Sequence, residues 1–367
     1  MKIGILTYHR AENYGALLQA YALMSYLRSL GYDVSFVDYW PKYHSDYFRL
    51  FPWQQFKNRR GIRKLIFLLQ LIFWVIPRFV RKRRLKRFMF EQLGLQRDAI
   101  YTSANSKTEK YDVVIYGSDQ IWRKQDLDGV GYDNWYFGSD NVQAVRKIVY
   151  AGSMGSINTT EKDDLYVKAM MQHFDCISVR ELDLHSYLES VGVLSSLVVD
   201  PVFLLSKEQW KELSGNSVSK TRYILFYNLL DTPESVRFVK KLSIEKQLPI
   251  KEISKKMSPF HIGKRYIKTA SVKYFLQLIY GAEYVVSNSF HGVAMSLIFH
   301  KKIYAVGMGK KASRVCSLIE SLGMEDLYSE EGDKIPDVII DYKVVENRLS
   351  RLVNKSKDFI KESISHE

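Results

Sequence analysis

The sequence predicts an α/β protein whose strands form open parallel sheets covered by helices. Short apolar runs alternate with helix-like runs along nearly all of the 367 residues. Several of these runs end in glycine and small polar residues, which is typical of parallel strands that deliver their loops to one edge of a sheet. The chain is also longer than one typical domain, so we expect two.

The strands of the first half can be placed from these runs. Ile3–Leu6 is expected to be a strand, and a helix should follow over Ala16–Leu30, with Gly31 ending it. Later strands are expected at the following segments: Val34–Val37, Val113–Tyr116 and Ile148–Ala151. The last two lead directly into the glycine-containing loops that begin at Gly117 and Gly152.

A second series of strands starts near residue 176. Its expected members are Cys176–Val179, Leu197–Val199, Tyr223–Tyr227, Ile250–Ile253, Tyr284–Val286 and Ile303–Val306. We place the domain boundary after the polar helix that spans Thr160 to His173, which gives domains at 1–175 and 176–367. Two Rossmann-like domains facing a cleft is the architecture that this pattern favours.

An insertion at about residues 56–93 departs from the alternation. Between Lys57 and Phe90 there are twelve Lys or Arg and no acidic residue, so this segment accounts for most of the net charge of +14. Its apolar centre, Leu65–Ile76, ends at Pro77 and would reach only about 18 Å as a helix, too short to span a bilayer. It suits a segment lying on an anionic membrane surface, although a buried helix beside a solvated basic one is the alternative. Nucleic acid is not expected as a partner, because no nucleic-acid-binding signature is present.

The remaining composition bears on the compartment and on metals. The N-terminus enters a strand directly, without the pattern of a signal peptide. The two cysteines, Cys176 and Cys316, stand singly without metal-ligand spacing. We therefore expect a cytoplasmic protein with no bound metal, located peripherally on the inner leaflet of the membrane.

The segment from Tyr284 to Phe299 is the most informative stretch of the chain. A strand-like run ends at the polar residues Ser287, Asn288 and Ser289, and a helix-like run starts after His291 and Gly292. Such a turn is where α/β sheets bind ligands, and the start of the helix offers free N–H groups to an anion. Gly292 would let a ligand approach the backbone, and His291 can transfer a proton. Alternatively, His291 only caps or packs the turn.

The first loop, Thr7 to Leu23, is a second candidate ligand contact. Asn13, Tyr14 and Gly15 form a tight turn in which Asn13 is expected to cap the helix. Neither G-x-G-x-x-G nor the P-loop motif occurs, so no dinucleotide or P-loop nucleotide is indicated.

Six blocks in this order resemble the polysaccharide pyruvyl transferase family. They are the first loop, Tyr116–Trp122, Tyr150–Gly155, Ser178–Glu181, Val199–Pro201 and Ser287–Gly292. The resemblance implies a GT-B-like fold. It also implies an enzyme that moves the enolpyruvyl carbons of phosphoenolpyruvate onto two hydroxyls of a sugar, forming a pyruvate ketal and releasing phosphate, in the building of a polysaccharide such as an exopolysaccharide or capsule. We expect the sugar to be part of a lipid-linked precursor, and phosphoenolpyruvate to be a co-substrate in the absence of any cofactor.

The resemblance assigns roles on both sides of the cleft. Donor binding falls on Arg180 and on the turn formed by Asn288, Ser289, Phe290 and Gly292, with His291 as the catalytic acid or base. Many relatives carry an arginine where this chain has Ser289, so another cation must meet the phosphate, with Lys264, Arg265 and Lys310 as candidates.

The loop after the third strand is interpreted as the acceptor side. Asp119 would orient or deprotonate a sugar hydroxyl, Gln120 would bond another hydroxyl, and Trp122 would stack on a pyranose, with Asn13 and Tyr14 bordering the same cleft. Asp119 as a simple loop cap is the alternative. Asp200-Pro201 is expected to be a structural turn.

Two other functions stay open at this point. The first is a GT-B glycosyltransferase that uses a nucleotide sugar, because one fold supports many chemistries. The second is a non-catalytic, membrane-associated protein that binds glycans.

Overall fold

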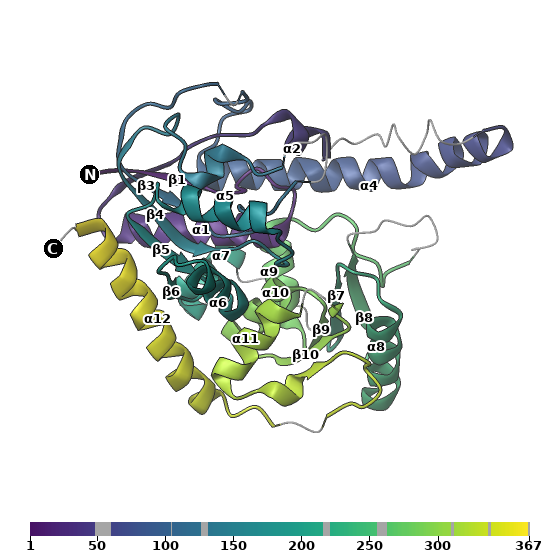
Figure 1. Ribbon diagram of the computed structural model, residues 1–367. Coiled ribbons are helices and arrows are strands. Elements are labelled where there is room, and N and C mark those ends of the chain that lie inside the picture. The colour runs from purple at the N-terminus through teal and green to yellow at the C-terminus, as the bar shows by residue number, and fades with distance from the viewer. Residues whose placement is uncertain are drawn as a thin grey trace.

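Two parallel sheets organise the chain (Figure 1). The computed structural model describes residues 1–47, 60–103, 105–125, 131–215, 221–254, 263–309, 312–336 and 339–365. The first sheet has the strand order β2-β1-β3-β4-β5-β6. Its strands are β1 (Lys2–Leu6), β2 (Asp33–Phe36), β3 (Tyr111–Tyr116), β4 (Ala144–Gly152), β5 (Cys176–Val179) and β6 (Ser196–Leu197).

Helices of the first half connect these strands. They are α1 (Tyr14–Ser29), α2 (Lys42–Tyr47), α4 (Ile62–Leu93), η1 (Asn134–Phe137), α5 (Glu161–Met171) and α6 (Leu182–Ser190). Local sequence explains where two of them begin. The side chain of Asn13 accepts from the N–H of Gly15 and caps α1, as expected. Thr160 and Asp163 form a capping box at the start of α5.

The second sheet has the strand order β11-β10-β9-β7-β8. Its strands are β7 (Ile224–Asn228), β8 (Ile250–Ser254), β9 (Tyr284–Ser287), β10 (Lys302–Val306) and β11 (Tyr328–Ser329). The elements around it are η2 (Pro201–Leu204), α7 (Lys207–Ser214), α8 (Pro233–Lys246), α9 (Val272–Gly281), α10 (Phe290–Ile298), α11 (Ser313–Leu322), η4 (Glu325–Leu327) and α12 (Tyr342–Ser365). The expected α/β class, with two Rossmann-like domains, is confirmed.

Both sheets share one topology. Counting strands from the start of each domain gives the order 2-1-3-4-5-6 in the first sheet and 2-1-3-4-5 in the second. In this arrangement the order in which successive strands are added reverses between the first and third strands, and ligands bind in the crevice outside the carboxyl ends of those strands. The crevice lies between β1 and β3 in the first domain and between β7 and β9 in the second. The loops that leave β3 and β9 carry the Gly117–Trp122 and Ser287–Gly292 blocks.

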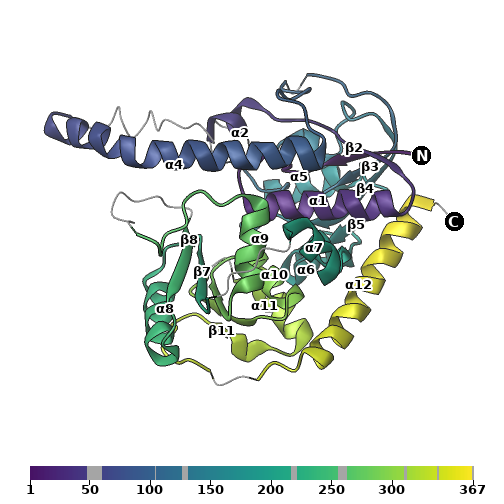
Figure 2. The same cartoon turned by 180° about the vertical axis from the view of Figure 1, so that it is seen from behind.

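The predicted boundary between residues 175 and 176 is wrong. β5 pairs with β4, and β6 pairs with β5, so the first sheet continues to Leu197. The chain also returns at its end, because α12 runs back along the first domain (Figures 1 and 2). There the N–H of Val199 donates to the hydroxyl of Ser356 on α12, at 2.9 Å. The first domain is therefore completed by a helix distant in sequence.

The basic-apolar insertion forms the single long helix α4, whose first half extends beyond both sheets (Figures 1 and 2). Pro77 does not end it, contrary to expectation. Proline removes one backbone hydrogen bond, but the helix beyond it is held by packing of Leu85, Phe88 and Leu93 in the main core. None of the helices in the described part of the chain is both long and apolar enough to cross a bilayer.

Three of the basic residues on α4 bind the body of the protein. Arg81 donates to the carbonyl of Ser254 at 3.2 Å, and Arg84 donates to that of Thr269 at 2.5 Å. Lys82 pairs with Glu12 at 2.6 Å. Because these contacts join α4 to both domains, the three side chains are structural ties as well as positive charges.

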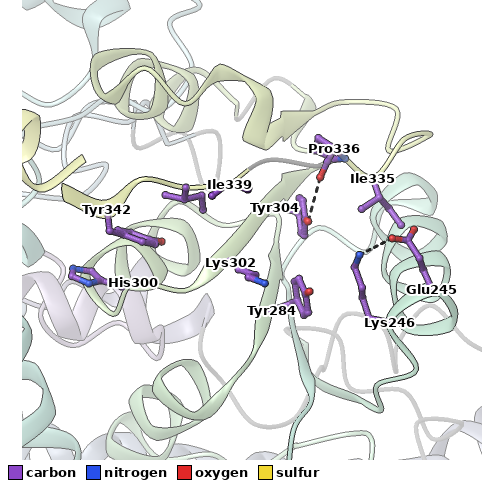
Figure 3. A pocket seen from close by; sticks show the side chains of 11 residues that line it. Glu245, Lys246, Tyr284, His300, Lys302, Tyr304, Ile335, Pro336, Ile339 and Tyr342 are labelled. Atoms are coloured by element: carbon purple, nitrogen blue, oxygen red, sulfur yellow. Dashed lines mark hydrogen bonds and ion pairs between the residues drawn. The ribbon is translucent and has the colours of Figure 1, made fainter. Parts of the chain in front are cut away.

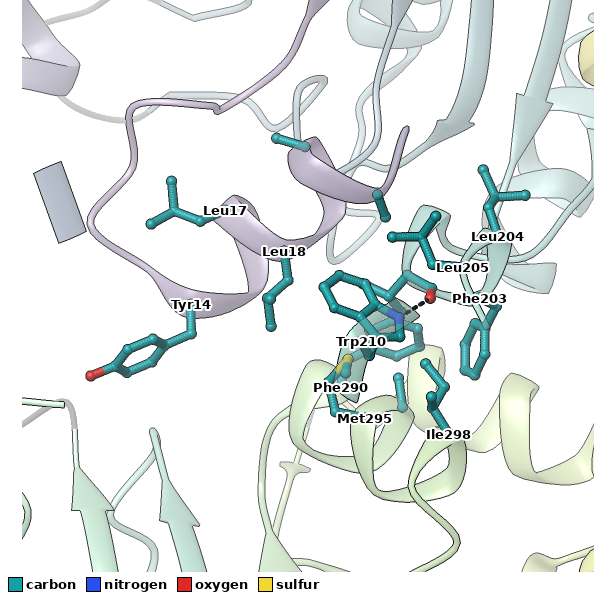
Figure 4. Close-up of a cluster of buried hydrophobic side chains, with 14 of the residues drawn as sticks. Tyr14, Leu17, Leu18, Phe203, Leu204, Leu205, Trp210, Phe290, Met295 and Ile298 are labelled. Carbon is teal, nitrogen blue, oxygen red and sulfur yellow. Dashed lines mark hydrogen bonds between the residues drawn. The ribbon is translucent and has the colours of Figure 1, made fainter. Parts of the chain in front are cut away.

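The two domains share an apolar core around α1 (Figure 4). Leu17 and Leu18 of α1 are fully buried, and Trp210 of α7 donates from its indole N–H to the carbonyl of Val202 at 3.0 Å. Met295 of α10 is buried in the same cluster. This shared core sets the first turn of α1 against the first turn of α10, where the candidate site lies.

Candidate functional site

Arg180 is the centre of a buried polar cluster at the boundary between the domains. It directly follows β5, and its side chain is only 1% exposed. Its Nη1 donates to the hydroxyl of Ser118 at 2.8 Å and to the carboxylate of Asp200. Its Nε lies 3.2 Å from Glu181, while its Nη2 lies 3.7 Å from Asp119 and makes no hydrogen bond within the described residues. One guanidinium N–H pair is thus free to bind an additional anion.

Asp200 links Arg180 to His291. One oxygen of its carboxylate accepts from Arg180 and from Ser118, and it lies 3.7 Å from Nε2 of His291. The other oxygen accepts from the N–H of Val202 and caps η2. Burial alone would raise the pKa of Asp200, but the charge of Arg180 keeps it below the usual value. Asp200 is therefore a structural turn, as expected, and also a member of the polar cluster.

His291 stands in the first turn of α10 and faces the other domain. Its Nε2 is buried and has no hydrogen-bond partner among the described residues. A Cβ atom added to Gly15 would lie 2.1 Å from its Nδ1, so the imidazole rests against the first turn of α1. Burial lowers the pKa of His291 to about 4, with Asp200 opposing that shift and Arg180 adding to it. His291 is therefore neutral near pH 7.

Phe290 holds two arginines against its ring. The guanidinium carbon of Arg180 is 5.4 Å from the ring centroid and that of Arg314 is 5.9 Å away. Nε of Arg314 also lies 3.9 Å from Glu181, whose other carboxylate oxygen has no partner in the described part of the chain. The hydroxyl of Ser153 donates to Glu181 at 2.6 Å. Burial raises the pKa of Glu181, against the charge of Arg180 and then of Arg314.

The arrangement can bind an anion and move a proton. The first residues of α10 are Phe290, His291 and Gly292, and the N–H groups of a helix's first turn have no partner within the helix. They lie beside Arg180 and the neutral His291. A negatively charged ligand would meet donors that cannot satisfy one another, next to a group able to take up a proton.

Four of the predicted site residues do not reach an open surface. Trp122 is fully buried, its indole N–H donates to Tyr136, and it packs on Phe137, so the predicted stacking on a pyranose is wrong. Tyr14 is 1% exposed and stacks on Phe275 at 4.5 Å, which makes it an interdomain packing residue and not a border of the acceptor cleft.

The other two are Asn288, in the turn before α10, and Gly292, in the first turn of α10. Both polar ends of the Asn288 side chain are used inside the second domain, by the N–H groups of Leu229 and Leu230 and by Asn228 and Ser235. A Cβ on Gly292 would lie 2.2 Å from the hydroxyl of Ser287. The glycine therefore allows α10 to pack on β9, and the prediction that it makes room for a ligand is wrong.

The other predicted positions are compatible with their roles. Asn13 is exposed at the start of α1, and Gln120 is partly buried beside Gly155. Asp119 accepts from the N–H of Gln120 at 2.9 Å, as the alternative of a loop cap requires, and also faces Arg180. Ser289 is buried and does not cap α10 with its side chain. Among the cations proposed to replace the missing arginine, Arg265 pairs with Glu252 at 2.8 Å, and Lys310 lies outside the described residues.

Sequence reasoning missed Ser118, Ser153 and Arg314. The first two belong to the loops that follow β3 and β4, so the strand-end pattern pointed to their loops without singling them out. Arg314 comes from the start of α11 after β10, and no motif marks it.

An aromatic group lies beside Asp119 at the ends of β1 and β2. His44 stacks on Trp40 with 4.7 Å between ring centroids and meets Tyr8 edge-on at the same distance. Its Nε2 is buried without a hydrogen-bond partner among the described residues. Burial lowers the pKa of His44 to about 4, and the nearby charge of Asp119 opposes that shift. A second neutral imidazole thus faces the loop that carries Asp119.

The cavities of the structure differ in position. A cavity of about 100 Å³ touches the cluster itself, with Arg180, Asp200, Phe290 and Arg314 in its lining. A larger one of about 550 Å³ lies at the amino ends of β9 and β10, beside Tyr284 and Lys302 (Figure 3). Because ligands of parallel sheets bind at the carboxyl ends of the strands, only the first belongs to the candidate site. Within the described residues, no group of three or more His, Cys, Asp or Glu side chains is arranged to hold a metal ion.

Solved structures similar to the chain have low identity to it. The UDP-GlcNAc 2-epimerase of Methanocaldococcus jannaschii, in complex with UDP-GlcNAc and UDP, is 11% identical, with a TM-score of 0.47 over 97% of this chain and 100% of that one. The heptosyltransferase WaaC of E. coli, with ADP, is 10% identical, with a TM-score of 0.38 over 99% and 100%.

The family comparison is direct. No curated protein matches the chain significantly. The sequence profile described as polysaccharide pyruvyl transferase, however, matches residues 13–308, which include the first turn of α1, the loops after β3 and β4, Arg180 and the His291 turn. The chain therefore belongs to the polysaccharide pyruvyl transferase family.

Proposed function

We propose that this protein transfers the enolpyruvyl group of phosphoenolpyruvate onto two hydroxyls of one sugar and releases phosphate. The observation that carries the proposal is the meeting of two unsatisfied groups, Nη2 of Arg180 and Nε2 of His291, beside the first turn of α10. A ligand with two anionic groups is suited to such a site, because charge-assisted hydrogen bonds to buried donors are the strong ones.

Binding of the donor would favour the protonated form of His291, which can then act as a general acid. Burial lowers the pKa of His291 to about 4, and a phosphate or carboxylate nearby would raise this pKa by favouring the charged form. His291 then takes up a proton as the donor binds and delivers it to C3 of phosphoenolpyruvate. C2 becomes electrophilic at the same time and can be attacked by the first sugar hydroxyl.

The acceptor hydroxyls lose their protons on the opposite side. Asp119 lies next to Arg180, and the neutral His44 lies near Asp119, so both are placed to accept a proton. After the first attack, the C2–O bond to phosphate breaks and the second hydroxyl bonds to C2. The products are one cyclic ketal and one phosphate. Tyr8 and Trp40, in place of the buried Trp122, would provide aromatic surface for the sugar.

We further propose that the acceptor is lipid-linked and that α4 binds the membrane which carries it. Ile62, Ile66 and Ile76 on α4 are 73%, 46% and 61% exposed. Their spacing places them on one face of the helix. Arg83 and Lys86 are exposed cations on the same helix, which suits an anionic leaflet.

A liposome experiment tests the membrane step. Ile62→Asp with Ile66→Asp should release the protein from anionic vesicles, because a carboxylate on the apolar face does not enter the acyl boundary and is repelled by anionic lipids. Ile244→Asp is the matched control, since Ile244 is 80% exposed on α8, away from α4. Equal binding of both variants would contradict the role of α4. Gln replacements of Arg81, Lys82 and Arg84 are unsuitable, because they would break the ties of α4 to the protein body.

The reaction is tested with phosphoenolpyruvate and a panel of lipid-linked and free sugars. We expect phosphate release that depends on the sugar, and a product whose mass equals sugar plus pyruvate minus water. His291→Ala should lower turnover by about 10² or more, the usual contribution of a positioned acid or base. Turnover of a nucleotide sugar without phosphoenolpyruvate would identify a glycosyltransferase instead. Sugar binding without either reaction would identify a glycan-binding protein.

A further inference from the structure

Arg314 is a cation of the buried cluster that lacks a strong partner. Its side chain is 16% exposed, and its closest charged contact is Glu181, at 3.9 Å. Among the described residues, the structure records no hydrogen bond from its guanidinium group. Arg314 is also the second residue of α11, so it is fixed near the free N–H groups of another helix start.

The charge of Arg180 is already compensated, whereas that of Arg314 is not. Arg180 contacts three carboxylates, those of Asp200, Glu181 and Asp119. Among the described residues, Arg314 has one carboxylate within ion-pair distance, that of Glu181, which it shares with Arg180. Asp119 and Asp200 act on it from farther away. Burial, and then the charge of Arg180, lower the pKa of Arg314, so an anion placed between the two guanidinium groups would relieve an unfavourable environment.

Geometry places both guanidinium groups around one ring. Arg180 and Arg314 lie 5.4 Å and 5.9 Å from the centroid of Phe290, and both line the same small cavity together with Asp200. A ligand with two anionic groups at this position would meet one arginine from each domain. The arginine with the freer charge suits the group that carries more negative charge, which is the phosphate.

We propose that Arg314 is the second cation of the donor site and binds the phosphate of phosphoenolpyruvate. It thereby supplies the positive charge that this chain lacks at Ser289, and it stabilises the phosphate as the C2–O bond breaks. The inference rests on the proposed function and adds to it a specific partner for the leaving group. Arg180 is left to bind the carboxylate, next to His291.

Two inhibitors separate the anionic groups of the donor. Inorganic phosphate resembles the leaving group, and pyruvate carries the carboxylate without a phosphate. Arg314→Gln removes the charge but keeps a polar side chain. It should raise the KM for phosphoenolpyruvate and the inhibition constant of phosphate by about tenfold or more, the usual effect of losing a charge-assisted contact. Inhibition by pyruvate should stay unchanged. Arg314→Lys should recover part of the loss, because a lysine keeps the charge without the fork.

A neighbouring hydrogen bond provides the control. The hydroxyl of Ser313 donates to Asp183 of the first domain at 2.7 Å, so Ser313→Ala removes a link between the domains without changing a charge. Its KM and phosphate inhibition should match those of the wild type. If Ser313→Ala shows the same loss as Arg314→Gln, Arg314 acts as a domain link and the inference is wrong.

Four other outcomes would overturn the inference about Arg314 or the proposed function. Unchanged phosphate inhibition in Arg314→Gln overturns the inference while leaving the proposed function intact, provided that the wild type releases phosphate with its sugar. Equal weakening of phosphate and pyruvate inhibition overturns the assignment to the phosphate. If Arg314→Gln does not fold, Arg314→Lys provides the test. Phosphate inhibition of Arg314→Lys equal to that of the wild type would then contradict the inference that the guanidinium group of Arg314 binds the phosphate. Failure of the wild type to use phosphoenolpyruvate would instead reject the proposed function.

Discussion

Gly15→Ala is a substitution whose effect can be worked out from the contact between α1 and α10. The added Cβ would lie 2.1 Å from Nδ1 of His291, and all three atoms nearest to it belong to that imidazole. Real Cβ atoms essentially never approach within 3.0 Å of another heavy atom, so the ring or the helix must move by about 1 Å. A displacement of that size at a reacting group lowers turnover by about 10².

The effect on stability has two opposing parts. Alanine is favoured over glycine inside a helix by about 0.5–1 kcal/mol, because it loses less backbone entropy on folding. Forcing an extra methyl group into a packed site costs about 1–3 kcal/mol. Gly15→Ala in the wild type should therefore be neutral or destabilising. In a His291→Ala background the clash is absent, so the same change should stabilise the protein by about 0.5–1 kcal/mol.

The assay is a double-mutant cycle in which thermal unfolding and turnover are measured for the two single variants and the double variant. Turnover of the double variant should equal that of His291→Ala, because the three atoms nearest to the added methyl group all belong to the imidazole. If Gly15→Ala changes stability equally in both backgrounds, or leaves wild-type turnover intact, the contact between Gly15 and His291 does not position the imidazole.

Four further predictions concern Arg180, the two buried imidazoles and Trp122. Arg180→Ala should raise the KM for phosphoenolpyruvate and lower kcat/KM. Arg180→Lys should rescue this loss only in part, since a lysine cannot replace the guanidinium group that joins Ser118, Asp200 and the donor. Full rescue by Arg180→Lys would argue for a purely electrostatic role. Binding of phosphoenolpyruvate near pH 7 should be accompanied by proton uptake, because the donor raises the pKa of His291 from about 4. Calorimetry in two buffers of different ionisation enthalpy would measure this uptake. Zero uptake would show that His291 stays neutral. For the protein without donor, the folded-state pKa of His291 and of His44 is about 4, below the unfolded value near 6.5. The unfolded state therefore binds more protons between these two pH values, so stability to urea should fall as the pH is lowered from about 6.5 to about 4. A stability curve that is flat in the wild type but steep in the His291→Ala variant would contradict the burial of a neutral imidazole. Trp122→Ala should destabilise the fold by about 3–5 kcal/mol, while Trp122→Phe should leave the KM for the sugar unchanged, because Trp122 is a core residue.

The strands and the position of the site were predictable from local sequence. Apolar runs that end in polar residues identify β3, β5 and β9, and the carboxyl ends of parallel strands gather at one edge of a sheet. This rule did not join Arg180 to the His291 turn, because β5 and β9 belong to different sheets. The expectation that the two share a site came from the resemblance to the family. The residue type at the start of α1 also predicted the Asn13 cap, which depends only on neighbouring residues.

Properties that depend on distant contacts were not predictable. The domain boundary failed because β6 has only two residues and pairs with β5, so nothing in its sequence marks it as part of the first sheet. Trp122 reads as a sugar-stacking residue until the packing of Tyr136 and Phe137 around it is known. Arg314 enters the cluster through the docking of α11 against α6, an interdomain contact that no local pattern encodes.

The central claim is that a donor-bound, protonated His291 delivers a proton to C3 of phosphoenolpyruvate during transfer to a sugar. The most direct measurement is the reaction run in D₂O and read by mass spectrometry and phosphate release. We predict one phosphate per ketal and one solvent deuterium in the methyl group of each ketal, with both signals lost together in His291→Ala. Phosphate released without ketal formation, or a ketal whose methyl group carries no solvent deuterium, would contradict the claim.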